Sequence, residues 1–182
     1  NYTTNLCANG NEAYATPAQV NSAAWDAVIN GANGIQWFCD DSVAYDACAG
    51  GGPGGQPAVS GSRTYGIAAN LTYIDNTIEG FAPELNSPNV PGLTTASTLP
   101  VVTMLKNVGG AYYLFVMSDR DGFTKATFTD PALAGKTATL VYNSAAHYLP
   151  VIDNVLYHKV TTAGSFTVRF GPAYEVKVYK IS

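Results

Sequence analysis

The segment TPAQVNSAAWDAVINGANGIQWFCDD, residues 16–41, decides how this chain is expected to fold. Thr16 can cap a helix, Pro17 suits its first position, and apolar residues then recur at helical spacing. Asn33-Gly34 ends the helix, and residues 35–38 are few and apolar, which predicts an interior strand. A helix that leads into a buried strand with two carboxylates at its end is half of a βα repeat. Parallel α/β folds place their chemistry at that end of the strand.

Composition indicates a globular protein. Of the 182 residues, 47% are hydrophobic and 12% are charged, so the chain can bury a core. The net charge of −4, without a basic run, argues against nucleic acid and against an anionic membrane surface as partners. No apolar stretch approaches the ~20 residues of a membrane span.

Cysteine usage and overall composition favour a secreted protein. Tyr, Asn, Thr, Gly and Ala are abundant, whereas Lys and Glu are scarce. Cys39 and Cys48 lie nine positions apart and could close a surface loop as a disulfide, which leaves Cys7 odd. The alternative is three free thiols in a cytosolic protein. Residues 1–15 read as a loop, so we expect the chain to begin within a larger protein, with any signal peptide removed or upstream.

A second helix follows a long glycine- and proline-rich loop. The loop, residues 39–65, contains AGGGPGGQPAVSGS and cannot form a helix or a strand. Apolar residues then step by four and three from Ile67 to Leu85, which predicts an amphipathic helix that Asn86-Ser87-Pro88 ends. The loop could be a linker between domains or a βα loop over a site. The contiguous helix–strand–loop–helix order favours the second interpretation.

From Pro88 onward the pattern changes to short strands. The expected strands are residues 101–106, 111–117, 123–129, 137–142, 155–160, 165–170 and 174–181. Asn107-Val108-Gly109-Gly110 joins the first two as a hairpin. Seven such strands joined by turns predict an antiparallel β-sandwich. The last strand alternates apolar and polar residues, so we expect one buried and one solvated face.

Two groups of residues resemble the C-terminal part of retaining (β/α)8 glycoside hydrolases. The first comprises residues 16–20, Trp25, 30–35 and 37–38, and is similar to the segment from the seventh helix to the eighth strand of those barrels. The second comprises residues 164–166, 170–172 and 174–181, and is similar to the end of their appended sandwich. The resemblance covers nearly the whole chain. It implies an α/β plus all-β fold, in which the terminal βα unit of a TIM barrel precedes a small antiparallel β-sandwich.

The resemblance also implies a domain division and a role. Residues 1–87 would be the C-terminal portion of the catalytic barrel, 88–100 a linker and 101–182 the sandwich. The chain would then supply part of a sugar-binding cleft to a secreted hydrolase of poly- or oligosaccharides, and its partner would be the remainder of the barrel, in the same or a second chain. Retaining chemistry needs two carboxyls ~5–5.5 Å apart, and in these families both lie upstream of Thr16. None of Glu12, Glu79, Glu84 and Glu175 matches those positions, so we expect no catalytic residue here and no activity from this segment alone.

Five residues are candidates for substrate binding. Trp37 stands where the resemblance implies an aromatic platform for a sugar ring, although a core-packing tryptophan is the alternative. Asp40 and Asp41 could bind sugar hydroxyls or cap the next turn. They are not a paired acid and base, because adjacent residues of an extended segment point in opposite directions. Gln36 and Tyr45 are weaker candidates, for which core or surface positions are the alternative.

No cofactor or metal is expected. The sequence contains no P-loop, GxGxxG or CxxC motif, and His147 and His158 lack a ligand spacing. Residues 119–122 lack the later ligands of a calcium loop and predict a tight turn. A second function, a non-catalytic carbohydrate-binding or interaction module that uses the sandwich alone, stays open. The sandwich has no tryptophan, and its aromatic residues alternate as core residues do, which argues against that function. These aromatic residues are Tyr112, Phe115, Tyr142, Tyr148, Tyr157 and Tyr179.

Overall fold

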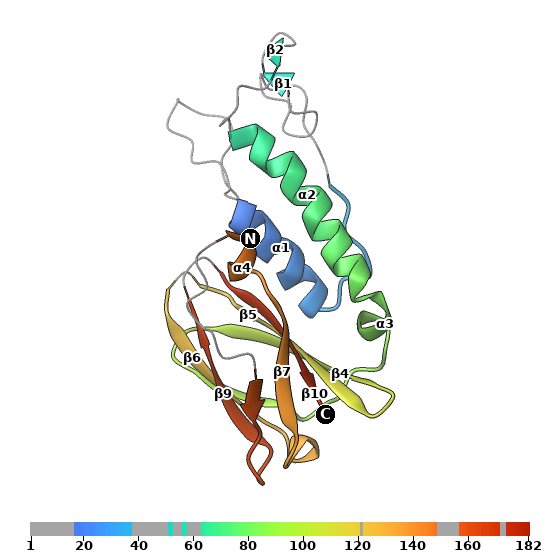
Figure 1. Cartoon of the computed structure of the whole chain (residues 1–182), viewed down its shortest axis with the longest axis vertical. Helices are drawn as coiled ribbons and strands as arrows, with labels where there is room; N and C mark the ends of the chain where they lie inside the picture. The colour runs from blue at the N-terminus through green and yellow to red at the C-terminus, as the bar shows by residue number, and fades with distance from the viewer. Residues whose placement is uncertain are drawn as a thin grey trace.

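A layer of helices lies above a two-sheet sandwich in the computed structural model (Figure 1), which describes residues 17–37, 51–52, 56–57, 63–120, 122–148, 157–171 and 174–182. The helices are α1 (Pro17–Ile29), α2 (Arg63–Gly80), α3 (Ala82–Leu85) and α4 (Ala145–Tyr148), with a 3-10 turn at Pro131–Leu133. Strands β1 (Gly51–Gly52) and β2 (Gln56–Pro57) pair as a short ladder in the part of the chain that joins α1 to α2, so the prediction that this loop forms no strand was wrong. None of the described helices combines the length and the apolar character needed to cross a bilayer.

Both long helices form where the apolar periodicity predicts them. The second is interrupted at Phe81, so the expected single helix is α2 followed by α3. Pro83, the second residue of α3, explains the interruption, because a proline within a continuous helix would lack an N–H donor and clash with the carbonyl of Glu79. Asn86 caps the end of α3, as the sequence predicts.

The predicted hairpin is confirmed. Strand β4 (Val101–Val108) pairs with β5 (Ala111–Ser118) in antiparallel register. The two residues of the turn, Gly109 and Gly110, have φ values of 58° and 88°. Positive φ at both positions is the requirement of a type I′ turn, which glycine meets without strain.

The remaining strands complete two antiparallel sheets. They are β3 (Thr94–Ser97), β6 (Thr124–Thr129), β7 (Thr137–Asn143), β8 (Tyr157–Lys159), β9 (Ser165–Phe170) and β10 (Val176–Ile181). One sheet has the order β4-β5-β10-β7-β8 and the other the order β3-β6-β9. Their facing side chains, among them Leu114, Phe128, Val168 and Ile181, form one buried core. The prediction of an antiparallel sandwich is confirmed. The sequence missed β3, which lies in the stretch expected as a connector.

Helices cover the other face of the five-stranded sheet over β4, β5 and part of β10. Trp25 of α1 is fully buried against Phe115 of β5, and Phe81 and Leu85 pack around the same cluster. Strand β10 is therefore buried on both faces, with Val178 toward the helices and Tyr179 toward the second sheet. The prediction of a solvated face on this strand was wrong, because the helical layer occupies the space that water would fill.

Strand β10 also buries a lysine within the sandwich. Lys177 of β10 is 0% exposed, and its Nζ donates to the carbonyl oxygen of Arg169 at 2.6 Å. The same nitrogen lies 3.4 Å from Oε1 of Glu175, which is buried as well. Oε2 of Glu175 in turn accepts from the backbone N–H of Gly171. Burial of these charges is tolerated because each meets an opposite charge or a backbone partner.

The expected interior strand at residues 35–38 does not form in residues 35–37, and Phe38 lies outside the described residues. A parallel strand needs a neighbouring strand to receive its N–H and C=O groups, and no described strand pairs with this segment. The chain instead packs Ile35 against the cluster between helices and sheet.

Candidate functional site

A glycine turn at the end of α1 brings the candidate residues beside α2. The N–H of Ala32 donates to the carbonyl of Ala27 at 2.9 Å, and the N–H of Gly31 donates to that of Val28 at 3.0 Å. This pair of bonds is a Schellman motif, which needs a left-handed residue at its turn. Gly31 meets the requirement with a φ of 97°. The chain therefore reverses, and residues 32–37 run back along the helices.

Trp37 is held in place by a hydrogen bond to α2. Its indole Nε1–H donates to Oδ1 of Asp75 at 2.9 Å, and the side chain is half-buried. A tryptophan that is tied at its nitrogen and open in part to solvent can present aromatic surface without losing much further rotational freedom. The neighbouring Gln36 is exposed.

The other predicted site residues lie outside the described residues. These are Asp40, Asp41 and Tyr45, together with the cysteines Cys7, Cys39 and Cys48. The structure therefore leaves both the binding roles and the expected disulfide as predictions. In the described part of the chain, no three His, Cys, Asp or Glu side chains gather where they could hold a metal ion. The ring of His147 stacks on Tyr73 with centroids 3.7 Å apart, and His158 packs edge-on against Tyr179.

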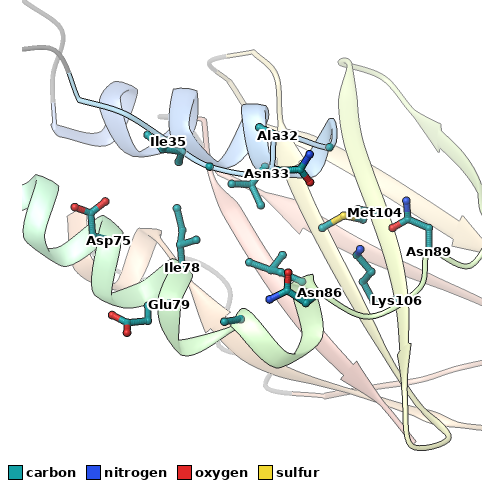
Figure 2. A pocket seen from close by; sticks show the side chains of 15 residues that line it. Ala32, Asn33, Ile35, Asp75, Ile78, Glu79, Asn86, Asn89, Met104 and Lys106 are labelled. Carbon is teal, nitrogen blue, oxygen red and sulfur yellow. The ribbon is translucent and has the colours of Figure 1, made fainter.

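A pocket of about 510 Å³ lies between the 31–35 turn, the end of α2, α3 and β4 (Figure 2). Its apolar wall includes Val28, Ile35, Ile78, Leu85 and Met104. Its polar groups are three asparagine amides, two carboxylates and one ammonium, contributed by Asn33, Asn86, Asn89, Asp75, Glu79 and Lys106. This volume lies in the range of small-molecule sites, which are largely apolar with a few polar groups that set orientation.

Lys106 supplies the ammonium from the end of β4. The residue is only 7% exposed, and its Nζ donates to the carbonyl oxygen of Ser87 at 2.9 Å. Burial disfavours the charged form and lowers the pKa of the Lys106 ammonium. A backbone bridge between Asn89 and Lys106 fixes the chain after α3 along the edge of β4, which positions the Ser87 carbonyl.

Sequence reasoning missed this pocket. The sequence did contain a sign that Lys106 is buried. Val102, Met104 and Lys106 share one face of the predicted strand, so the lysine stands in a row of apolar residues. The remaining pocket residues come from separate elements, and no local pattern places those elements together. Asp75 contributes to the pocket and also bonds Trp37, so the two features adjoin.

Comparison with known proteins identifies no family. No family model matches the sequence, and no curated protein matches it. Among solved structures, the chain is similar to a mutant of isomaltulose synthase from Erwinia rhapontici NX5 in complex with its natural substrate sucrose, with 16% identity and a TM-score of 0.37. The match covers 76% of this chain and 24% of that chain, so the present chain spans about a quarter of its length. Likeness at this level establishes neither a family nor an activity.

Proposed function

We propose that this chain is the C-terminal segment of a secreted, retaining glycoside hydrolase that acts on a poly- or oligosaccharide. In this proposal residues 1–87 complete a (β/α)8 barrel, residues 88–100 connect, and residues 101–182 form a β-sandwich that stabilises the barrel. The remainder of the barrel, in the same or a second chain, supplies the two catalytic carboxyls. The resemblance of the helix–strand segment and of the chain's last strand to such enzymes motivates the proposal.

The observation that carries the proposal is the bond between Trp37 and Asp75. A half-buried indole, fixed at its nitrogen, suits stacking on the C–H face of a sugar ring. The segment that contains it, residues 35–37, pairs with no described strand. The lack of a described partner strand agrees with an eighth barrel strand whose neighbours come from the rest of the barrel, and Trp37 would stand at its carboxyl end.

The alternative is a non-catalytic module that binds carbohydrate or another partner through the sandwich. Its support is Tyr157 on β8, an edge strand of the five-stranded sheet, because this side chain is 67% exposed. The expectation that the sandwich aromatics are core residues holds for Phe115 and Tyr179, which are fully buried, and is wrong for Tyr157.

The first test is the intact mass of the native protein, measured with disulfides preserved and again after reduction. The proposal expects a polypeptide that extends beyond these 182 residues, or a second chain that accompanies them. A shift of about 2 Da on reduction per bond would count the disulfides, and peptide mapping would show whether one of them joins Cys39 to Cys48. A native protein complete at 19.1 kDa that folds without a partner would contradict the hydrolase proposal.

The second test is substitution of Trp37 in the assembled protein. Trp37→Ala should lower kcat/KM on the substrate polysaccharide about tenfold, equivalent to about 1.4 kcal/mol, because the stacking surface is lost. Tyr157→Ala is the matched control and should leave activity unchanged. If Tyr157→Ala abolishes sugar binding while Trp37→Ala does not, the alternative function replaces the first.

A further inference from the structure

The pocket beside β4 carries a buried positive charge that has no carboxylate partner in the described chain. Lys106 Nζ has three donors, and the Ser87 carbonyl accepts from it at 2.9 Å. No described carboxylate oxygen lies within 4.0 Å of this nitrogen, whereas the other buried lysine of the core, Lys177, has Glu175. An ammonium removed from water is costly unless it is paired, so an anion that entered this pocket would be stabilised there.

Asparagine amides lie around the ammonium and can bind the hydroxyl groups of a ligand. Asn86 and Asn89 lie on the same side of the pocket as Lys106, and Asn33 lies near its middle (Figure 2). Each amide offers both a donor and an acceptor, which is the combination that matches a hydroxyl group. The apolar side chains of Val28, Leu85 and Met104 complete the wall and suit the C–H surface of a ligand.

Charge differs between the two ends of the pocket. Asp75 and Glu79 of α2 lie at the end opposite Lys106, and both are exposed (Figure 2). Carboxylates at this end would repel a second anionic group and accept hydrogen bonds from hydroxyls. We therefore expect the pocket to prefer a ligand that has one carboxylate and several hydroxyls. A neutral ligand would leave Lys106 unpaired, and a ligand with an anionic group at each end would be repelled by Asp75 and Glu79.

We infer that this pocket binds a small polyhydroxylated carboxylate of the sugar-acid class, with the carboxylate on Lys106 and the hydroxyls on the asparagine amides and the α2 carboxylates. The pocket adjoins Trp37 through Asp75 but is centred on Lys106, and the inference stands whether or not the chain completes a hydrolase.

Isothermal titration of the native protein, together with any chain that accompanies these residues, with glucuronate and separately with glucose tests the inference at neutral pH. The two probes share a pyranose ring and differ in the carboxylate. We expect saturable binding of glucuronate at least tenfold tighter than that of glucose. Equal affinity for the two sugars, or no binding of glucuronate at millimolar concentration, would overturn the inference.

Two variants and a control locate the site. Lys106→Met removes the charge at similar volume and should weaken glucuronate binding at least tenfold. Lys125→Met removes the same charge from an exposed position on β6, outside the pocket, and should leave binding unchanged. Ala82→Phe fills the pocket while the ammonium stays, and it should weaken binding as strongly. If Lys106→Met fails to fold, Ala82→Phe alone tests whether glucuronate binds in this pocket. Unchanged binding in a folded pocket variant would disprove the assignment.

Discussion

At the scale of single residues, Gly164 marks the tightest backbone approach in the sandwich. Its φ is +76°, and a Cβ atom added there would lie 1.9 Å from the carbonyl oxygen of Asp130. The approach is required because the N–H of Asp130 donates to the carbonyl of Gly164 at 3.1 Å. Gly164→Ala should therefore lower the free energy of unfolding by about 3 kcal/mol or more, from left-handed strain together with a backbone clash. Denaturant unfolding would measure this loss.

Gly135 provides the matched control for that prediction. Its φ of +72° is nearly the same, but no atom lies within 4 Å of the position that a Cβ would take. Gly135→Ala should thus cost only the conformational strain, about 1–2 kcal/mol. Equal losses at the two positions would show that the contact with Asp130 contributes nothing.

The residue scale also shows where prediction from sequence ends. The dipeptide Ala163-Gly164 predicts a turn from local chemistry alone, and the turn is present. The approach of Asp130 depends on the pairing of β6 with β9, in which Thr129 lies opposite Ser165. That pairing joins residues far apart in the chain, so no local sequence pattern predicts it. The same holds for Lys106, whose burial depends on α3 and on the segment after it.

At the scale of elements, Trp25 attaches α1 to the sheet. The side chain is fully buried, with ring centroids 6.0 Å from Phe115, 5.7 Å from Tyr142 and 6.1 Å from Phe81. Trp25→Ala should destabilise the protein by about 3–5 kcal/mol, because a large cavity would open between two layers. Chemical denaturation, followed by circular dichroism, would measure the change.

Trp25→Phe serves as the control for cavity size. It keeps an aromatic ring against Phe115 and should cost less than half as much as Trp25→Ala. Stability unaffected by Trp25→Ala would mean that the helical layer does not contribute to the folding of the sheet. A matching loss in both variants would instead point to the indole itself.

Elements with a local signature were predictable, and those defined by their neighbours were not. The helices and the β4–β5 hairpin follow from periodicity and from Gly109-Gly110. Strand β3 was not predicted from the sequence, because all four of its residues are exposed and mostly polar, so they show no alternation of apolar and polar residues. The missing strand at residues 35–37 and the second buried face of β10 share one cause. In both cases the neighbouring elements decide the outcome, namely whether residues 35–37 form a strand and whether both faces of β10 are buried.

At the scale of the whole molecule, three layers share two cores. One core lies between the sheets, and the other lies between the five-stranded sheet and the helices. The second core contains Met104, Phe115, Met117, Val176 and Val178 from the sheet. Polar links reinforce the same contact, since Ser22 Oγ of α1 donates to the carbonyl of Tyr174 at 2.8 Å. The part of the sheet under the helices therefore lacks a face suited to water, although Thr137, Thr139 and Tyr157 on β7 and β8 are exposed, and this bears on whether the sandwich can act alone.

A fragment of residues 88–182 tests that point. It would expose the apolar residues that α1, α2 and α3 cover, a continuous patch of the kind that drives association. We expect the fragment to oligomerise and to bind the dye anilinonaphthalene sulfonate, whereas the native protein, in which the helices cover these residues, should bind less dye. Size-exclusion chromatography with light scattering, together with dye fluorescence, would show this. Phe115→Thr and Val178→Thr in the same fragment should reduce both signals, because they break the patch. A fragment that stays monomeric and binds no dye would instead favour a sandwich that works as an independent module, since only a sheet that tolerates water on this face could do so.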